Sequence, residues 1–268
     1  MNITAILVAA VVVGVVGVFI GFFLGFAGKK FAVEVDEREE AILGVLPGNN
    51  CGGCGYAGCS GLAAAIVKGE AEVNQCPVGG STVANQIGAI MGIEASEGKR
   101  MTAFVRCSGT TDKTKSDYSY SGLVDCRAMS YVPNGGPKHC DYGCLGYGSC
   151  VKACPFDAIH IVNGIAKVDR EACKACGKCV AVCPKSLIEI IPYDSVYVVR
   201  CGSKGKGKVV IDACSTGCIG CGLCQKNCEA GAITVIDNIA RIDYDKCTHC
   251  GVCVEKCPKK IIVAHAEL

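Results

Sequence analysis

The first 28 residues form an almost unbroken apolar stretch. Residues 1–28 contain no charged side chain, and residues 3–26 are nearly all hydrophobic. A helix of this length crosses the hydrocarbon core of a bilayer. A cleaved signal peptide is the alternative, but it would have a basic segment ahead of a shorter apolar run. We therefore predict a single transmembrane helix over residues 1–28.

Two lysines, Lys29 and Lys30, follow this stretch directly, and no charged side chain precedes it. Positive charges beside a single span favour the cytoplasmic side of a membrane. The pattern predicts a single-pass protein of the cell membrane, with the rest of the chain in the cytoplasm.

Beyond the lysines the pattern of apolar and polar positions changes twice. Residues 31–46 are rich in charge and have a helical pattern that Pro47-Gly48 ends, so we predict a tether over residues 29–47. Further along, short alternating apolar runs flank Asn163-Gly164 and Asp237-Asn238, which is typical of β-hairpins. We expect an α+β chain of several small domains.

Cysteine usage indicates the chemistry, because 24 of the 268 residues are Cys. Many stand in C-x2-C-x2-C triplets, and this spacing binds iron–sulfur clusters rather than forming a disulfide scaffold. Cluster-binding thiols must stay reduced, which agrees with the cytoplasmic orientation. The formal net charge of +2 gives no reason to expect a nucleic-acid partner.

An internal repeat organises these cysteines. Each cysteine from Cys140 to Cys183 has a counterpart at one constant offset, in a second copy that runs from Cys214 to Cys257. Ahead of the two copies, Arg106-Cys107 is matched by Arg200-Cys201. The chain therefore carries two bacterial-type 2[4Fe-4S] ferredoxin-like modules in tandem. We place them at residues 96–192 and 193–268.

In ferredoxins of this type, the first three cysteines of a motif hold one [4Fe-4S] cubane and the fourth reaches the other. This crossed pattern predicts two regular clusters in the second module and one in the first. Their ligands are Cys218, Cys221, Cys224 and Cys257; Cys247, Cys250, Cys253 and Cys228; and Cys173, Cys176, Cys179 and Cys154.

The other cluster of the first module is irregular, because Tyr147 stands where the repeat has Cys221. We expect Cys140 to substitute, unless this cluster lacks one thiolate. The set is then Cys140, Cys144, Cys150 and Cys183, which leaves over Cys107, Cys126, Cys201 and Cys214. The four left over would form a sixth cubane between the modules or remain buried thiols, and Cys140 could exchange roles with Cys214.

A separate cysteine motif precedes the repeats. Its cysteines are Cys51, Cys54, Cys59 and Cys76, in the spacing C-x2-C-x4-C-x16-C-P. Three of them lie on a glycine-rich loop, and an apolar helical run precedes the fourth. The spacing suits one [4Fe-4S] cluster, with tetrahedral zinc as the alternative. The motif resembles the small iron–sulfur domain of corrinoid iron–sulfur proteins, and we place this domain at residues 48–95.

A basic segment, GSKGKGK at residues 202–208, is close to a phosphate-binding loop. Val209 stands where Ser or Thr would bind magnesium, and no helix is evident after the segment, so we reject that interpretation. Its lysines belong to a group near the C-terminal cluster motifs: Lys204, Lys206, Lys208, Lys256, Lys259 and Lys260. These would attract an acidic redox partner, or form an ordinary solvated surface.

In order along the chain, the single span, CGGCGYAGC, the RCSG and DCRA segments and the final ferredoxin module resemble the B-subunit family of the Rnf complex. The cysteine sets above correspond to five [4Fe-4S] clusters, or to six if the four left-over thiols form another. The resemblance implies that the protein accepts electrons from reduced soluble ferredoxin and relays them to membrane and NAD-reducing subunits of an ion-translocating ferredoxin:NAD⁺ oxidoreductase. No dinucleotide fingerprint is present, so we expect this chain to carry electrons without a substrate-converting site.

Two other functions fit the same motifs. A polyferredoxin subunit of another membrane reductase or hydrogenase would have similar cysteine spacing. A zinc-dependent or thiol-rich scaffold would hold metal without electron transfer. Iron with acid-labile sulfide would indicate electron transfer, and zinc would indicate a scaffold.

Overall fold

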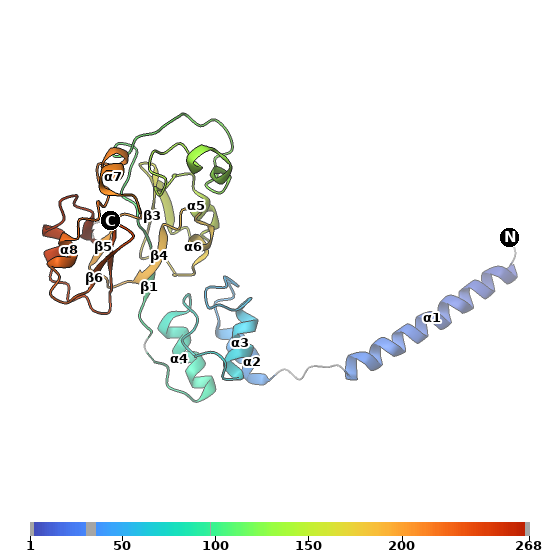
Figure 1. Cartoon of the computed structure of the whole chain (residues 1–268). Helices are drawn as coiled ribbons and strands as arrows, with labels where there is room; N and C mark the ends of the chain where they lie inside the picture. Colours follow the sequence, from blue (N-terminus) through green and yellow to red (C-terminus); the bar gives the residue numbers. More distant parts are fainter. Residues whose placement is uncertain (1–2, 31–35, 97, 266–268) are drawn as a thin grey trace.

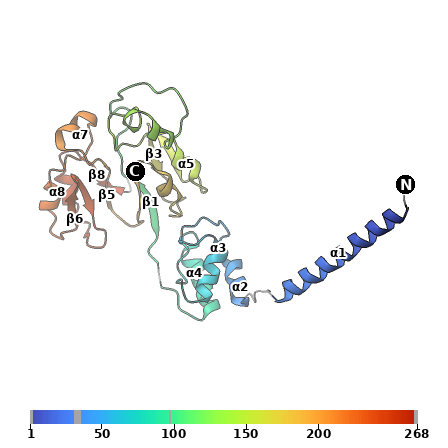
Figure 2. The same cartoon turned by 45° about the vertical axis from the view of Figure 1, so that its right-hand side comes forward.

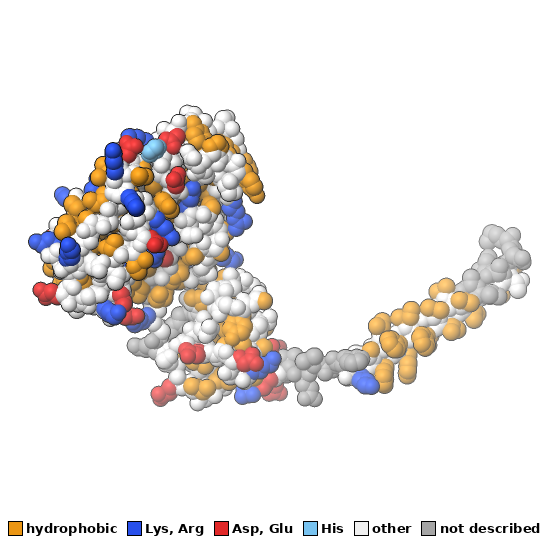
Figure 3. Space-filling view, viewed as in Figure 1, with side chains coloured by type: hydrophobic (Ala, Val, Ile, Leu, Met, Phe, Trp, Pro, Cys, Tyr) orange, Lys and Arg blue, Asp and Glu red, His pale blue; other side chains and the backbone are white. Residues whose placement is uncertain are grey.

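A computed structural model of the chain describes residues 3–30, 36–96 and 98–265. Residues 1–2 of the predicted membrane stretch, residues 31–35 of the predicted tether and the side chain of Lys29 lie outside the described residues. Within the described part, Ile3–Lys30 forms one continuous helix, α1 (Figure 1). Hydrophobic side chains cover most of the part of α1 that is coloured by residue type in Figure 3, and its segment Val11–Gly28 has a mean hydropathy of 2.5 with no part buried. It is long and apolar enough to cross a membrane, as predicted.

Three helices form a small domain after α1: α2 (Glu37–Val45), α3 (Cys59–Val67) and α4 (Gly80–Met91). Ile42 of α2 is completely buried and packs with Leu62, Ile66 and Ile87. Residues 37–46 therefore belong to this domain, whereas the sequence placed them in a tether. Their charge hid the two apolar positions, Ile42 and Leu46, that attach α2 to its neighbours.

The first ferredoxin-like module contains two antiparallel strand pairs. Strand β1 (Met101–Val105) pairs with β4 (Ile188–Pro192), and β2 (Ile159–Val162) pairs with β3 (Ile165–Val168). The predicted hairpin is confirmed, with Asn163 and Gly164 in the left-handed conformation that its tight turn requires. Helices α5 (Ser149–Ala153) and α6 (Lys178–Val182) flank the strands.

A long loop separates β1 from α5, green in Figure 1, and contains two single 3₁₀ turns. These are η1 (Ala128–Tyr131) and η2 (Pro133–Gly135). Met129 of η1 is completely buried, so the loop packs onto the module.

The second module repeats this arrangement. Strand β5 (Tyr197–Val199) pairs with β8 (Ile262–Ala264), and β6 (Ile233–Ile236) pairs with β7 (Ile239–Ile242). The second predicted hairpin is thus also confirmed. Helices α8 (Leu223–Lys226) and α9 (Val252–Glu255) pack together beside the strands.

An additional helix, α7 (Gly207–Ala213), begins within the basic segment. The expectation that no helix forms there is wrong. Val210 and Ala213 are buried, so tertiary packing stabilises a short helix whose sequence pattern is weak. Helix α7 ends at Cys214 and carries this cysteine to the boundary between the modules.

The two modules meet closely. Phe104 and Ile191 of the first module form a small buried cluster with Val198 of the second. Nearby, a Cβ atom on Gly202 would clash with Cδ2 of Leu187. The modules therefore form one packed unit, with an interface to which both contribute buried residues.

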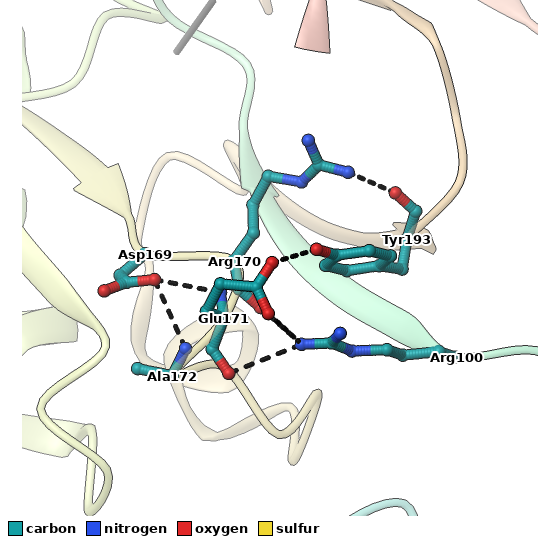
Figure 4. A network of polar contacts seen from close by, with 6 residues as sticks. All are labelled: Arg100, Asp169, Arg170, Glu171, Ala172 and Tyr193. Carbon is teal, nitrogen blue, oxygen red and sulfur yellow. Dashed lines mark hydrogen bonds and ion pairs between the residues drawn. The ribbon is translucent and has the colours of Figure 1, made fainter. Parts of the chain in front are cut away.

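A polar network fixes the loop that precedes Cys173 (Figure 4). Arg100, just before β1, pairs with Glu171 at 3.1 Å and lies over the Tyr193 ring, 3.7 Å from its centroid. Tyr193 donates a hydrogen bond to Glu171, and Arg170 donates one to the Tyr193 carbonyl. Asp169 accepts bonds from the amides of Glu171 and Ala172. The network ties one end of the β1–β4 pair, where β1 starts and β4 ends, to a cysteine-bearing loop.

Candidate iron–sulfur sites

All 24 cysteines are free, and twelve of them line three pockets, with four cysteines in each pocket. Within the described ranges, no three Cys, His, Asp or Glu side chains surround a position for one metal ion. The groups are therefore best described by the pockets they line and by the charges they exert on one another.

The clearest group lies in the second module. Cys218, Cys221, Cys224 and Cys257 line one pocket, as the repeat predicted. Burial, together with the charges of Cys218 and Cys257, raises the pKa of Cys224 to about 11. Lys259 lines the same pocket.

In two further predicted groups, neighbouring cysteines also raise the pKa of a buried thiol. Burial raises the pKa of Cys179 to about 12, and the charges of Cys173, Cys176 and Cys154 also raise it. For Cys253 the pKa is about 11, again through burial first and then the charges of Cys247 and Cys250. Cys228, the fourth predicted member of the second group, follows α8, which packs against α9.

The irregular group differs from the predicted set. Its pocket is lined by Cys126, Cys144, Cys150 and Cys183, with Cys126 in the place assigned from the sequence to Cys140. Burial, together with the charges of Cys144, Cys126 and Cys183, raises the pKa of Cys150 to about 12. Cys140 lines a different pocket.

Hydrogen bonds hold Cys126 on the first turn of α5. The amide of Cys126 donates to Oγ of Ser149 at 2.9 Å, and that hydroxyl donates to Asp125 at 3.1 Å.

A sequence signal for this arrangement exists. The segment between Cys107 and Cys140 is much longer than the segment between their counterparts Cys201 and Cys214. The first module therefore carries an insertion, and Cys126 lies within it. The insertion therefore supplies Cys126 as the fourth cysteine of the group that has Tyr147 in place of one cysteine of the repeat.

Cys140 instead joins three of the left-over cysteines between the modules. Cys107, Cys140, Cys201 and Cys214 line one pocket, which we call the interface pocket. Gly109 lies between two of these thiols, since its Cβ position is 3.5 Å from Sγ of Cys214 and 3.6 Å from Sγ of Cys107. Each module supplies one pair, and the two pairs are counterparts in the repeat.

Backbone amides stabilise the sulfurs of the interface pocket. Cys107 accepts a hydrogen bond from the amide of Cys144 at 3.4 Å, and Cys201 accepts the equivalent bond from Cys218 at 3.3 Å. The amide of Ser203 also donates to Cys201, at 3.5 Å. Such donors favour thiolates and adjust the reduction potential of a bound cluster.

A half-buried arginine, Arg200, also lines the interface pocket. Burial lowers its pKa, and the charge of Cys107 raises it, so the guanidinium and this sulfur lie near each other. Its Nε is buried without a hydrogen-bond partner among the described residues. The counterpart in the repeat, Arg106, pairs with Glu189 at 3.4 Å.

The small domain presents Cys51, Cys54, Cys59 and Cys76. Burial raises the pKa of Cys76, and the charges of Cys51 and Cys54 raise it as well, so these thiols lie close together. Cys59 begins α3, and its amide donates to Asn50 at 2.8 Å. The amide of Gly79 donates to Sγ of Cys76 at 3.4 Å.

Groups of four thiols with amide donors suit [4Fe-4S] clusters. The high thiol pKa values mean that buried cysteines without metal are neutral, whereas bound iron converts them to thiolates. Bound clusters would supply one-electron oxidation and reduction at each site.

Comparisons with known families agree with this chemistry. Residues 46–78 match the family described as "Putative Fe-S cluster". Residues 136–184 and 217–261 each match a family described as "4Fe-4S dicluster domain". Four of the thiols described above, Cys107, Cys126, Cys201 and Cys214, lie outside all three matched segments.

Curated relatives match nearly the whole chain. The B subunit of the Na(+)-translocating ferredoxin:NAD(+) oxidoreductase complex of Acetobacterium woodii is 46% identical over 99% of this chain and 80% of its own length. The B subunit of the ion-translocating oxidoreductase complex of Methanosarcina acetivorans is 45% identical over 88% of this chain and 89% of its own. The B subunit of the proton-translocating ferredoxin:NAD(+) oxidoreductase complex of Clostridium ljungdahlii is 41% identical over 91% and 88%.

Proposed function

Since the chain belongs to the B-subunit family of the Rnf, or ion-translocating oxidoreductase, complexes, and is an iron–sulfur electron-transfer subunit of that type, we propose that it accepts electrons from reduced ferredoxin. It relays them to other subunits, which reduce NAD⁺. This chain acts as a carrier and has no substrate-converting site of its own. The enzyme activity belongs to the complex.

The accessibility of the second module supports ferredoxin as the donor. Of the 24 cysteines, two are exposed, Cys221 and Cys250, and both belong to this module. Lys256 and Lys260 are exposed close to them in sequence, and Lys259 lines the pocket with Cys221. An exposed ligand with nearby positive charge suits an acidic protein donor, because local charge steers the encounter.

We propose six clusters, and three pockets that are each lined by four thiols support three of them. Four sets are those of the sequence: Cys51, Cys54, Cys59, Cys76; Cys154, Cys173, Cys176, Cys179; Cys218, Cys221, Cys224, Cys257; and Cys228, Cys247, Cys250, Cys253. Two sets are revised by the lining of the pockets: Cys126, Cys144, Cys150, Cys183; and Cys107, Cys140, Cys201, Cys214.

Iron and acid-labile sulfide measured on the anaerobically purified full chain test this proposal first. Six clusters correspond to about 24 iron atoms per chain, and five to about 20. A chain that contains zinc and no sulfide is a scaffold, and the redox function is then wrong. Mixing the iron-loaded chain with reduced ferredoxin tests the donor. If ferredoxin reduces the clusters, their visible absorbance should decrease after mixing.

The helix α1 and the family support a place in the cell membrane, and we propose that the iron–sulfur domains lie in the cytoplasm. Lys30 at the end of α1 follows an uncharged segment, which favours that orientation. Co-purification from the native membrane identifies the partner subunits and separates this complex from another membrane reductase or hydrogenase.

A further inference from the structure

The small domain and the first module touch through two cysteine-bearing loops. A Cβ atom on Gly53 would lie 2.9 Å from both Cα and the carbonyl oxygen of Cys176, and 3.1 Å from Cγ of Pro77. Gly53 lies between Cys51 and Cys54, and Cys176 is the middle cysteine of its own triplet. In both views the loop before α3 lies on the side of the small domain that faces the first module (Figures 1 and 2).

The glycine at position 53 is required by this contact and not by its own backbone. Its neighbours Gly52 and Gly55 have φ values of +75° and +89°, which disfavour other residues, whereas Gly53 has a φ outside that region. Alanine is therefore compatible with the local conformation at position 53. Backbone atoms of Cys176 fill the space that a methyl group would need, and backbone cannot rotate away as a flexible side chain can.

A second observation agrees that the loops are neighbours. A pocket beside the contact is lined by both units, with Gln75, Cys76 and Pro77 on one side and Cys173, Lys174 and Ala175 on the other.

The geometry points to the Gly53–Cys176 contact as the place where electrons cross between the small domain and the first module, with Gly53 as a positioning residue that lets the two ligand loops touch. This inference rests on the clusters proposed above. In the crossing, one electron leaves the cluster of one loop, which is oxidised, and enters the cluster of the other, which is reduced. No bond forms or breaks, and no proton moves.

A matched pair of alanine substitutions in the iron-loaded full chain tests the inference. Gly53→Ala introduces the clash. Gly61→Ala adds the same methyl group on α3 of the same domain, where the nearest atom is Cβ of Tyr56 at 3.8 Å, an ordinary contact. Both variants should keep the iron content of the unaltered chain.

Three measurements report directly on the Gly53–Cys176 contact. After full reduction with dithionite, Gly53→Ala should lose the magnetic interaction between the small-domain cluster and the Cys173 cluster in the EPR spectrum. Amide hydrogen exchange at residues 173–177 should become faster. After mixing with reduced ferredoxin, freeze-quenched samples of Gly53→Ala should show delayed reduction of the small-domain cluster. Gly61→Ala should match the unaltered chain in all three.

Unchanged magnetic interaction and unchanged reduction kinetics in Gly53→Ala would overturn the inference. Loss of the small-domain iron would also overturn it, because Gly53 would then serve its own cluster. If ferredoxin fails to reduce the unaltered chain, the proposed donor is wrong, while the dithionite spectra still decide the contact.

Discussion

The amide of Cys144 donates a hydrogen bond to the sulfur of Cys107 across 3.4 Å. This one hydrogen bond connects two of the cysteine pockets. Cys144 lines the pocket of the first module, and Cys107 lines the interface pocket. Because Cys218 and Cys201 repeat the bond at 3.3 Å, the interface pocket has an equivalent link to each module. A cluster there would lie between the two ferredoxin-like modules.

Serine substitutions distinguish the two possible ligand sets for Cys140. If Cys140 serves the interface pocket, then Cys107→Ser and the double variant Cys107→Ser with Cys140→Ser should each lose about four iron atoms. The double variant Cys126→Ser with Cys140→Ser should lose about eight, since it removes a ligand from two clusters. Iron and sulfide analysis gives the counts. A loss of about eight in both double variants would restore the assignment made from the sequence with a sixth cluster, and a loss of about four in both, with none in Cys107→Ser, would restore the five-cluster assignment.

Arg200 should adjust the reduction potential of one cluster. Arg200→Gln removes a positive charge near Cys107, so the reduced cluster loses an attractive interaction and its midpoint potential becomes more negative. Potentiometric titration followed by EPR measures the shift. The control is Arg106→Gln, because Glu189 already offsets the charge of Arg106. Equal shifts in both variants would contradict a specific effect of Arg200.

Docking of ferredoxin should depend on the lysines beside the exposed clusters. The triple variant Lys256→Glu, Lys259→Glu and Lys260→Glu should slow reduction by ferredoxin, because it replaces attraction by repulsion. Stopped-flow absorbance measures the rate, which in the unaltered chain should fall as the Debye length shortens below about 10 Å.

Two controls accompany this docking experiment. Lys68→Glu reverses an exposed charge on the small domain and should leave the rate unchanged. A small uncharged chemical donor should reduce the triple variant as fast as the original. If ferredoxin does so as well, the docking surface lies elsewhere.

Buried His265 should make the stability of the fold depend on pH. Burial, and secondarily the charge of Arg170, lower the pKa of His265 from 6.5 to about 4. As pH falls, His265 therefore binds a proton near pH 6.5 in the unfolded chain, but only near pH 4 in the folded chain. Stability should be constant above that range and decrease as pH falls through it, by about 1 kcal/mol between pH 7 and pH 5.5.

Urea unfolding of the full chain at both pH values measures this loss. The variant His265→Gln keeps a polar group near Ser195, which contacts His265 at 3.2 Å, but cannot titrate. Its stability should change less between the two pH values than that of the original. The same change in both proteins would mean that other groups cause it.

Membrane orientation can be tested with a reporter fused after Leu268. Lys30 follows the uncharged segment of α1, so the C-terminal domains should stay in the cytoplasm. A reporter that is active only in the cytoplasm should therefore be active in this fusion. Activity of a periplasmic reporter at the same position would reverse the orientation.

Much of the architecture is determined by local sequence signals. Uncharged residues in an unbroken run form α1, and turn residues such as Asn163-Gly164 fix the hairpins, because each signal acts over a few neighbouring residues. The regular set of Cys218, Cys221, Cys224 and Cys257 also follows from spacing, since its first three thiols lie within one short motif. The constant offset between the two copies of the cysteine pattern extends these conclusions to both modules.

Tertiary structure decided the features that depend on contacts between distant segments. Helix α2 joined the small domain because the burial of Ile42 outweighed its charged surroundings. The sequence favoured Cys140 as the replacement for the ligand missing at Tyr147, whereas Cys126 lines that pocket and Cys140 lines the interface pocket. Which pocket each of these two cysteines lines depended on how the insertion between Cys107 and Cys140 folds over α5 and on how the two modules pack. Chain spacing cannot specify which thiols meet when they come from separate modules, because only packing brings Cys107 and Cys140 to Cys201 and Cys214.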